Sequence, residues 1–184
     1  LVALVRQLLS VCPLPVAIAA DGLNCLAAEP AVLKDLEVPV ILTPHPGEMA
    51  RLAGATVQEV QADRIACARD FAQQFNVHLV LKGAGTVVAH PDGSVYLNPT
   101  GNPGMAAGGM GDVLTGVIAG LVTRGVPPAE AARAGVYVHG RAADGLARQV
   151  APWGYLASEV MAAIPGQFRE LAGGADPAPG LAGG

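Results

Sequence analysis

The chain has 184 residues, which suits one domain, and 52% of them are hydrophobic, which is ample for a buried core. Charged residues make up 14%, and fifteen acidic against eleven basic residues leave a net charge of -4, so no basic face is available for nucleic acid. No apolar run free of Gly, Pro and charge reaches the roughly 20 residues that span a bilayer, so we expect neither a nucleic-acid nor a membrane partner.

The N-terminal half predicts helices and buried strands in alternation. Residues 2–9 are typical of the end of a helix. Residues 15–20 and 38–43 are short apolar runs of the kind found in parallel strands that are buried on both faces. Thr56 and Glu59 have capping-box spacing, and the apolar residues after them predict one long helix with a core-facing side formed by Val60, Ile65, Ala66, Ala68, Phe71, Ala72 and Phe75.

The C-terminal half continues the alternation. Residues 77–82 predict a third buried strand, and Asp92-Gly93 between residues 86–90 and 94–97 is a strong hairpin signal. Apolar residues at helical spacing predict a helix from Asp112 onward, after a turn at residues 108–111. Two further helices are expected at about 128–147 and 155–164, followed by a disordered Gly/Pro/Ala tail at 173–184.

These elements imply an α/β sandwich with a largely parallel sheet, in which ligands bind beyond the carboxyl ends of the strands. Five polar residues follow such ends, namely Asp21, Asn24, His45, Glu48 and Lys82. Their shared position favours a binding site at one edge of the sheet.

Three cysteines also bear on the class of protein. Cys12, Cys25 and Cys67 are scattered and lack CxxC spacing, which favours reduced thiols in a cytoplasm over a disulfide scaffold or a zinc site. The apolar start of the chain resembles a signal peptide only superficially, because Arg6 interrupts it and no cationic segment precedes it. We therefore expect a cytoplasmic protein.

The most informative stretch is residues 98–121, NPTGNPGMAAGGMGDVLTGVIAGL, which places seven glycines and one carboxylate around the start of an apolar helix. Glycines let backbone N–H groups point at an anion, and the helix dipole adds partial positive charge. Asp112 in that turn would repel a phosphate, so it is better interpreted as a base that takes a proton from an attacking hydroxyl. The alternative is a flexible loop followed by an ordinary acidic first-turn residue.

Two other segments support chemistry at this edge. His45 lies between two prolines, which hold an imidazole at a fixed place, although a turn histidine bonded to backbone is an equal alternative. Glu48 either holds a metal through water or caps a helix. Lys82 begins the segment Lys82-Gly83-Ala84-Gly85-Thr86, whose glycines allow a nucleotide to approach the backbone, although such segments also occur in ordinary turns.

Other histidines and the single tryptophan are interpreted as structural. We expect His78 and His139 on strand or helix surfaces, and His90 exposed at the end of a hairpin strand. Trp153 is expected to pack against the sheet or to contact another copy of the chain.

In order along the chain, ADGLNCLA, ILTPHPGEMARL, LKGAGTVVAHPDG and residues 98–121 resemble the ADP-dependent NAD(P)H-hydrate dehydratase family. The resemblance extends to about Leu171 and includes GYLASEV. It implies a ribokinase-like, three-layer α/β sandwich with a mostly parallel central sheet over residues 1–172.

The resemblance also implies an activity and its residues. Hydrated NADH or NADPH in the S configuration is phosphorylated by ADP, and loss of phosphate then restores the nicotinamide with release of AMP. His45 and Asp112 would contact the hydrated dinucleotide, with Asp112 as the catalytic base. The adenine nucleotide would be contacted by Lys82, Gly83, Ala84, Gly85, Thr86 and Gly111. Mg²⁺ is expected with the phosphates, and a homo-oligomer, by analogy a tetramer, is implied.

Two departures from the family pattern stand out. The first acid of the usual D-A-D-A-L-N is replaced by Ala19, and Gly22 replaces the following small residue. The strands and glycine-rich segments that family members carry before this point are not in the chain, so we expect a partial domain that lacks the first strands of the fold. A vitamin or sugar kinase of the same fold, and a nucleotide-binding remnant without catalysis, are the alternative functions.

Overall fold

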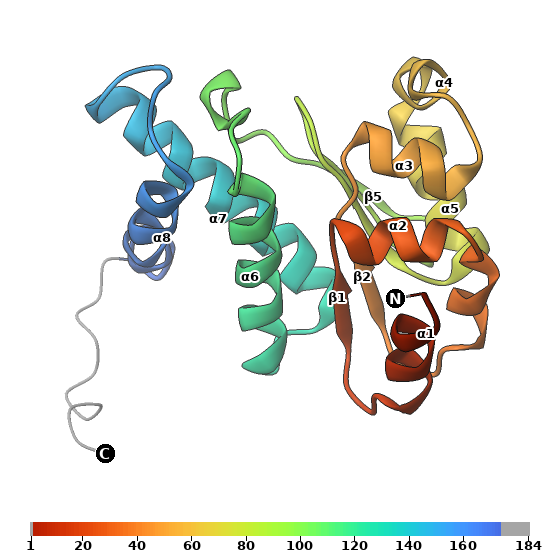
Figure 1. The fold of residues 1–184 in the computed structure, drawn as a ribbon. Helices are drawn as coiled ribbons and strands as arrows, with labels where there is room; N and C mark the ends of the chain where they lie inside the picture. Colours follow the sequence, from red (N-terminus) through yellow and green to blue (C-terminus); the bar gives the residue numbers. More distant parts are fainter. Residues whose placement is uncertain (1, 174–184) are drawn as a thin grey trace.

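The computed structural model describes residues 2–173, in which helices flank a five-stranded sheet (Figure 1). The helices are α1 (Val2–Val11), α2 (Asp21–Ala27), α3 (Pro46–Ala53), α4 (Val57–Ala62), α5 (Arg64–Phe75), α6 (Met110–Thr123), α7 (Pro128–Gln149) and α8 (Ala157–Leu171). The strands are β1 (Val16–Ile18), β2 (Val40–Leu42), β3 (His78–Leu81), β4 (Val87–Ala89) and β5 (Val95–Leu97). Two short 3-10 helices, η1 (Pro30–Asp35) and η2 (Pro103–Met105), complete the order. The tail predicted to be disordered lies outside the described residues, except for its first residue.

The sheet is mixed rather than mostly parallel. Its order is β1-β2-β3-β4-β5, with β1, β2 and β3 parallel to one another and with antiparallel pairs β3–β4 and β4–β5. The predicted Asp92-Gly93 hairpin joins β4 to β5, and β4 in turn runs antiparallel to β3. The expectation of a largely parallel sheet therefore holds for its first three strands only.

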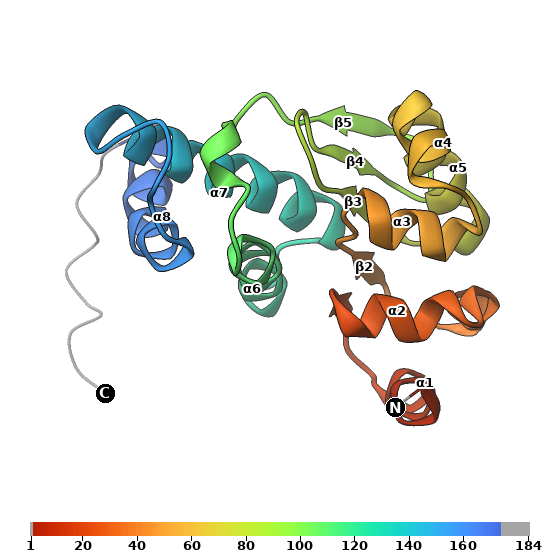
Figure 2. The same cartoon turned by 45° about the horizontal axis from the view of Figure 1, so that its top comes forward.

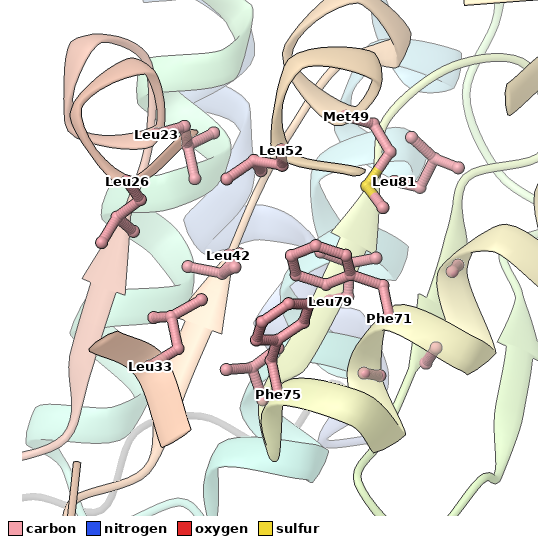
Figure 3. Close-up of a cluster of buried hydrophobic side chains, with 14 of the residues drawn as sticks. Leu23, Leu26, Leu33, Leu42, Met49, Leu52, Phe71, Phe75, Leu79 and Leu81 are labelled. Atoms are coloured by element: carbon pink, nitrogen blue, oxygen red, sulfur yellow. The ribbon is translucent and has the colours of Figure 1, made fainter. Parts of the chain in front are cut away.

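One face of the sheet carries the larger core. Leu42 of β2 and Leu79 and Leu81 of β3 point to this face, where they meet Phe71 and Phe75 of α5 (Figure 3). The two phenylalanine rings lie 4.4 Å apart between centroids. Side chains of α2 and α3 close the cluster above the strands, contributing Leu23, Leu26, Met49 and Leu52.

The other face is covered by α6 and α7. Ile41 and Val80 alternate with the residues of the first face and pack against Leu114 and Ile118 of α6. Gly135 allows α7 to lie close to α6, because a Cβ atom at residue 135 would lie 2.5 Å from Ile118 Cγ1. Figure 2 shows the sheet between α6 and α7 on one side and α2, α3 and α5 on the other. A third cluster, in which α8 packs on α6 and α7, extends this layer.

The structure breaks the predicted long helix in two. The capping box at Thr56 and Glu59 is present, but its helix, α4, ends before Asp63. Asp63 has φ −145° and ψ 84°, and its carboxylate accepts a hydrogen bond from the N–H of Ala66, so it caps a new helix, α5. Helix α6 also begins earlier than predicted, at Met110, because Gly109 adopts the left-handed conformation that precedes it.

Two expectations from composition can be compared with the described residues. Cys12, Cys25 and Cys67 are all free cysteines. Within residues 2–173, the structure contains no helix with the length and apolar character needed to cross a membrane.

Candidate functional site

The carboxyl ends of β1, β2 and β3 meet at one edge of the sheet, because these strands are parallel. Backbone hydrogen bonds continue past the strand ends: the N–H of Thr43 donates to Ile18 O at 3.1 Å, and that of Lys82 to Pro44 O at 2.8 Å. His45 and Glu48 thus follow β2 beside Lys82, which follows β3. Of the five residues expected at this edge, the structure brings these three together.

His45 is the N-cap of α3. Its Nδ1 atom accepts hydrogen bonds from the N–H groups of Gly47 at 2.9 Å and Glu48 at 3.2 Å. In the neutral ring the proton therefore lies on Nε2, an assignment made from these bonds. Gly47 has no room for a side chain, because a Cβ atom would lie 2.9 Å from His45 Cε1. The imidazole remains half exposed, and its Nε2 atom lies 3.6 Å from Glu48 Oε1.

Glu48 links this cap to Lys82. Its buried carboxylate accepts from the N–H of His45 at 2.7 Å, and Oε2 lies 3.7 Å from Lys82 Nζ. Lys82 reaches in turn to α6, since a Cβ atom at Gly111 would lie 3.0 Å from Lys82 Nζ. The buried carboxylate therefore holds the ammonium group against the first turn of α6.

Asp112 follows Gly111 in that turn, and its side chain is exposed. The turn is fixed to the sheet by two hydroxyls. Thr115 Oγ1 lies 2.9 Å from Gly111 O and 3.0 Å from Oγ1 of Thr43, which is fully buried at the end of β2. These contacts place the start of α6 at the same edge as Lys82.

The segment after Lys82 forms a tight loop to β4. Gly83 and Gly85 have φ values of 143° and 59°, which side chains rarely adopt. Thr86 Oγ1 donates to Gly83 O at 3.1 Å, and Thr86 O accepts from the N–H of Asn98 at 2.9 Å. The backbone of Gly83, Ala84 and Gly85 is exposed. The structure thus places the predicted site residues at one edge of the sheet, where the side chain of Asp112 makes no hydrogen bond or ion pair with the others.

A clamp on residues 98–105 was not predicted. The carboxylate of Asp144 on α7 accepts from the N–H of Gly101 and from Asn102 Nδ2, both at 2.9 Å. Asn102 Oδ1 accepts from the N–H of Gly104 at 3.0 Å and from the hydroxyl of Tyr155. The only signal in the sequence was an acidic residue, Asp144, in the second half of the helix predicted at about 128–147.

Arg64 was also missed. Its guanidinium donates to the carbonyl oxygens of Leu81 at 3.0 Å, Lys82 at 3.2 Å and Ala84. Burial lowers the pKa of Arg64 below its ordinary value. Asp21 and Asn24 form a separate chain of contacts, in which Asn24 accepts from Arg51 Nε at 2.9 Å and donates to Asp21 at 3.2 Å.

The remaining histidines lie away from this edge. Because Leu79 pairs with Ala89, His78 and His90 face each other, with their Nδ1 atoms 2.9 Å apart. His90 is buried, so the expectation that it is exposed was wrong. Burial is the main cause that lowers the pKa of His78 to about 4, and it also lowers that of His90. His139 is buried in α7, where burial lowers its pKa to about 4.

Comparison with known proteins identifies the family. A family model described as NAD(P)H-hydrate dehydratase matches residues 2–166. The chain belongs to the NAD(P)H-hydrate dehydratase family. It is 50% identical over 133 residues to the ADP-dependent (S)-NAD(P)H-hydrate dehydratase of Neisseria meningitidis serogroup B, covering 71% of this chain and 45% of that protein.

The solved structures that are similar to this chain include an NAD(P)H-hydrate dehydratase and a ribokinase-like protein. The ADP/ATP-dependent NAD(P)H-hydrate dehydratase of Bacillus subtilis, co-crystallised with ATP/Mg²⁺, has a TM-score of 0.76 and 39% identity, covering 85% of this chain and 55% of that chain. A ribokinase-like superfamily protein of Enterococcus faecalis has a TM-score of 0.77 and 26% identity over 92% of this chain and 58% of that one. The chain spans between 27% and 45% of the length of the curated relatives it matches.

Proposed function

We propose that this chain catalyses the ADP-dependent dehydration of hydrated NADH or NADPH in the S configuration. The hydroxyl of the hydrated ring would attack the β-phosphorus of ADP, with AMP as leaving group. Loss of phosphate together with a ring proton would then restore the dihydronicotinamide. The observation that carries the proposal is the position of Lys82 Nζ against Gly111, because it places a cation for phosphates one residue from Asp112.

Asp112 is the proposed base. It stands in the first turn of α6, where the helix N-terminus stabilises a negative charge. Its exposed carboxylate can accept a proton from the attacking hydroxyl, and transfer to a positioned base contributes about 10²–10⁴-fold in rate. His45 would bind the hydrated dinucleotide through the Nε2 donor of its half-exposed ring.

The adenine nucleotide would lie over the loop and the start of α6. Lys82 supplies a half-buried positive charge. Gly83, Ala84 and Gly85 are exposed and Thr86 is half-buried, so a diphosphate can approach this turn. Gly111 leaves room beside the ammonium group. The family resemblance and the close association of these residues support this assignment.

Magnesium is expected to accompany ADP rather than to occupy a site made by the protein alone. Among residues 2–173, no group of three or more His, Cys, Asp or Glu side chains is placed to hold a metal ion. Glu48 is buried and engaged by the N–H of His45 and by Lys82, so it does not fit as a direct ligand. Mg²⁺ commonly binds through substrate phosphates and retains water ligands. No step of the proposed reaction depends on a metal held by Glu48.

A larger sheet and an oligomer are part of the proposal. In the described residues β1 pairs with β2 alone, and the chain covers 55% of the solved B. subtilis relative, which supports further parallel strands beside β1 in the full fold. Trp153 is 74% exposed and does not pack against the sheet. Together with exposed Leu156 and Met161, it supports contact between copies, which light scattering can measure.

Recovery of NADH absorbance tests the function. Purified chain, and a version extended at its N-terminus to the length of its relatives, are mixed with hydrated NADH, Mg²⁺ and ADP. We expect NADH to reappear with stoichiometric AMP and phosphate; no recovery by either version contradicts the proposal. ATP-dependent phosphorylation of small alcohols would favour the kinase alternative, and calorimetric binding of ADP without turnover would favour the non-catalytic one.

A further inference from the structure

The guanidinium of Arg64 holds the loop between β3 and β4 at its start and in its middle. Nη2 donates to Leu81 O and Lys82 O before the turn, and Nη1 donates to Ala84 O within it. Arg64 is the first residue of α5, so these bonds also fix the loop to a helix of the core. A planar group with five donors can join three carbonyls in this way, whereas a lysine ammonium has no fixed fork.

These bonds set the direction of the loop's N–H groups. The peptide bonds are trans, so each carbonyl points opposite to the N–H of the next residue. The carbonyls of Lys82 and Ala84 point to Arg64, and therefore the N–H groups of Gly83 and Gly85 point away from it. The N–H of Lys82, which follows the Leu81 carbonyl, donates to Pro44 O, next to His45.

The glycines allow this arrangement. Gly83 lies against the guanidinium, since a Cβ atom there would lie 2.9 Å from Arg64 Nη2. Within residues 2–173, no backbone acceptor pairs with the N–H groups of Gly83, Ala84 or Gly85. Consecutive free N–H groups in a turn form a concave site suited to anions.

We propose that Arg64 is a positioning residue for the nucleotide, which aims the N–H groups of Gly83 and Gly85 at the phosphates of ADP without touching them. This inference rests on the proposed function, because ADP is the ligand that the loop would hold. Loss of Arg64 frees three carbonyls and lets the peptide units of the loop rotate. The affinity for the nucleotide should then fall more than the rate of the chemical step.

Calorimetry and steady-state kinetics on Arg64→Met, Arg64→Lys and wild type test the inference. We expect Arg64→Met to weaken ADP binding and raise the KM for ADP about tenfold or more, with a smaller effect on kcat. Arg64→Lys should fold like wild type but keep only part of the affinity for ADP. A further variant, Arg64→Ala, should bind ADP more strongly when guanidinium is added at low millimolar concentration. Arg69→Met is the matched control, because Arg69 lies on the same helix and pairs at the surface with Asp70 at 2.9 Å.

The outcomes separate the inference from the proposed function. If wild type binds ADP and Arg64→Met binds it equally well, Arg64 does not position the loop and the inference alone is wrong. A lower Tm with unchanged ADP affinity also contradicts the inference, since it indicates a merely structural role. If wild type binds no ADP in either length of chain, the proposed function and the inference are both wrong. Should Arg64→Met fail to fold, Arg64→Lys and guanidinium rescue decide the question.

Discussion

The ammonium group of Lys82 lies against Gly111 in the first turn of α6, so close that a Cβ atom at residue 111 would lie 3.0 Å from it. Glu48 holds the ammonium from the other side at 3.7 Å. A cation on one segment and a missing side chain on another thus fit together, although they are far apart in the sequence.

Gly111→Ala should separate folding from binding. Alanine favours a helix over glycine by about 0.5–1 kcal/mol, and Lys82 can move its flexible end, so we expect an unchanged or higher Tm. The displaced ammonium should weaken ADP binding by roughly tenfold, which calorimetry measures. Gly116→Ala in the same helix is the control, because a Cβ atom there meets nothing within 4 Å. Equal ADP affinity in both variants would show that the position of Lys82 does not matter.

Asp112→Asn should abolish turnover while leaving nucleotide affinity nearly intact. The amide keeps the size of the side chain but cannot take a proton, so kcat should fall by about 10²–10⁴-fold. NADH recovery and ADP calorimetry on the same preparation check both parts. Substantial turnover in this variant would mean that another group is the base.

Asp144→Asn should loosen residues 98–105. The carboxylate accepts from two donors, at Gly101 and Asn102, and an amide would place its own NH₂ against one of them. We expect a loss of about 2 kcal/mol in the free energy of unfolding, measured by urea denaturation, with faster proteolysis of this segment. Glu130→Gln removes only an exposed pair on the same helix, to Arg133 at 3.4 Å, and should change stability little. Equal effects of the two substitutions would argue against the clamp.

Acid should destabilise the fold partly through His139. Burial lowers its pKa to about 4 in the folded chain, whereas an unfolded histidine titrates near about 6.5. The unfolded state then binds more protons between these values, so the stabilising contribution of neutral His139 is complete above the unfolded pKa. It declines as pH falls toward 4, by up to about 1.4 kcal/mol per pH unit.

Substitution of His139 by Met tests this dependence. Methionine is apolar and fills a similar volume, so the variant should lose less stability than wild type as the pH falls from the unfolded pKa toward the folded one. Urea denaturation at several pH values gives the two slopes. Parallel slopes would show that His139 does not carry the acid sensitivity, since the His78–His90 pair is present in both proteins.

Local patterns predicted most elements of the fold. Ile41 and Leu42 are both buried, on opposite faces of the sheet, and an apolar run is enough to predict such a strand. The Asp92-Gly93 turn needs only its own two residues and their neighbours. The break at Asp63 was missed because apolar spacing continues across it, although an Asp three residues before Ala66 is a capping signal. The hairpin that makes β4 and β5 antiparallel was predicted. The prediction of a largely parallel sheet did not take this antiparallel pair into account.

Long-range contacts within the site were not predictable in the same way. His45, Lys82 and Asp112 were identified because each follows a strand or begins a helix. Arg64 begins α5, but the sequence predicted it inside one long helix, and Asp144 lies within α7. The partners of Arg64 are 17 to 20 residues away and those of Asp144 are 42 or 43 residues away, so only the packing of α5 and α7 brings these side chains to the loops they hold. A polar side chain that supports a loop from behind looks, in a sequence, like any other surface residue.

The loop from Lys82 to Thr86 has a consequence for how this chain can vary. Surface loops usually tolerate insertions, since added residues extend into solvent at small cost. The loop from Lys82 to Thr86 must reverse the chain between two paired strands and keep three carbonyl oxygens on one guanidinium. An added or deleted residue would disturb one of these two arrangements. Its number of residues should therefore be more strictly limited than the identity of Ala84, whose side chain takes no part in either task.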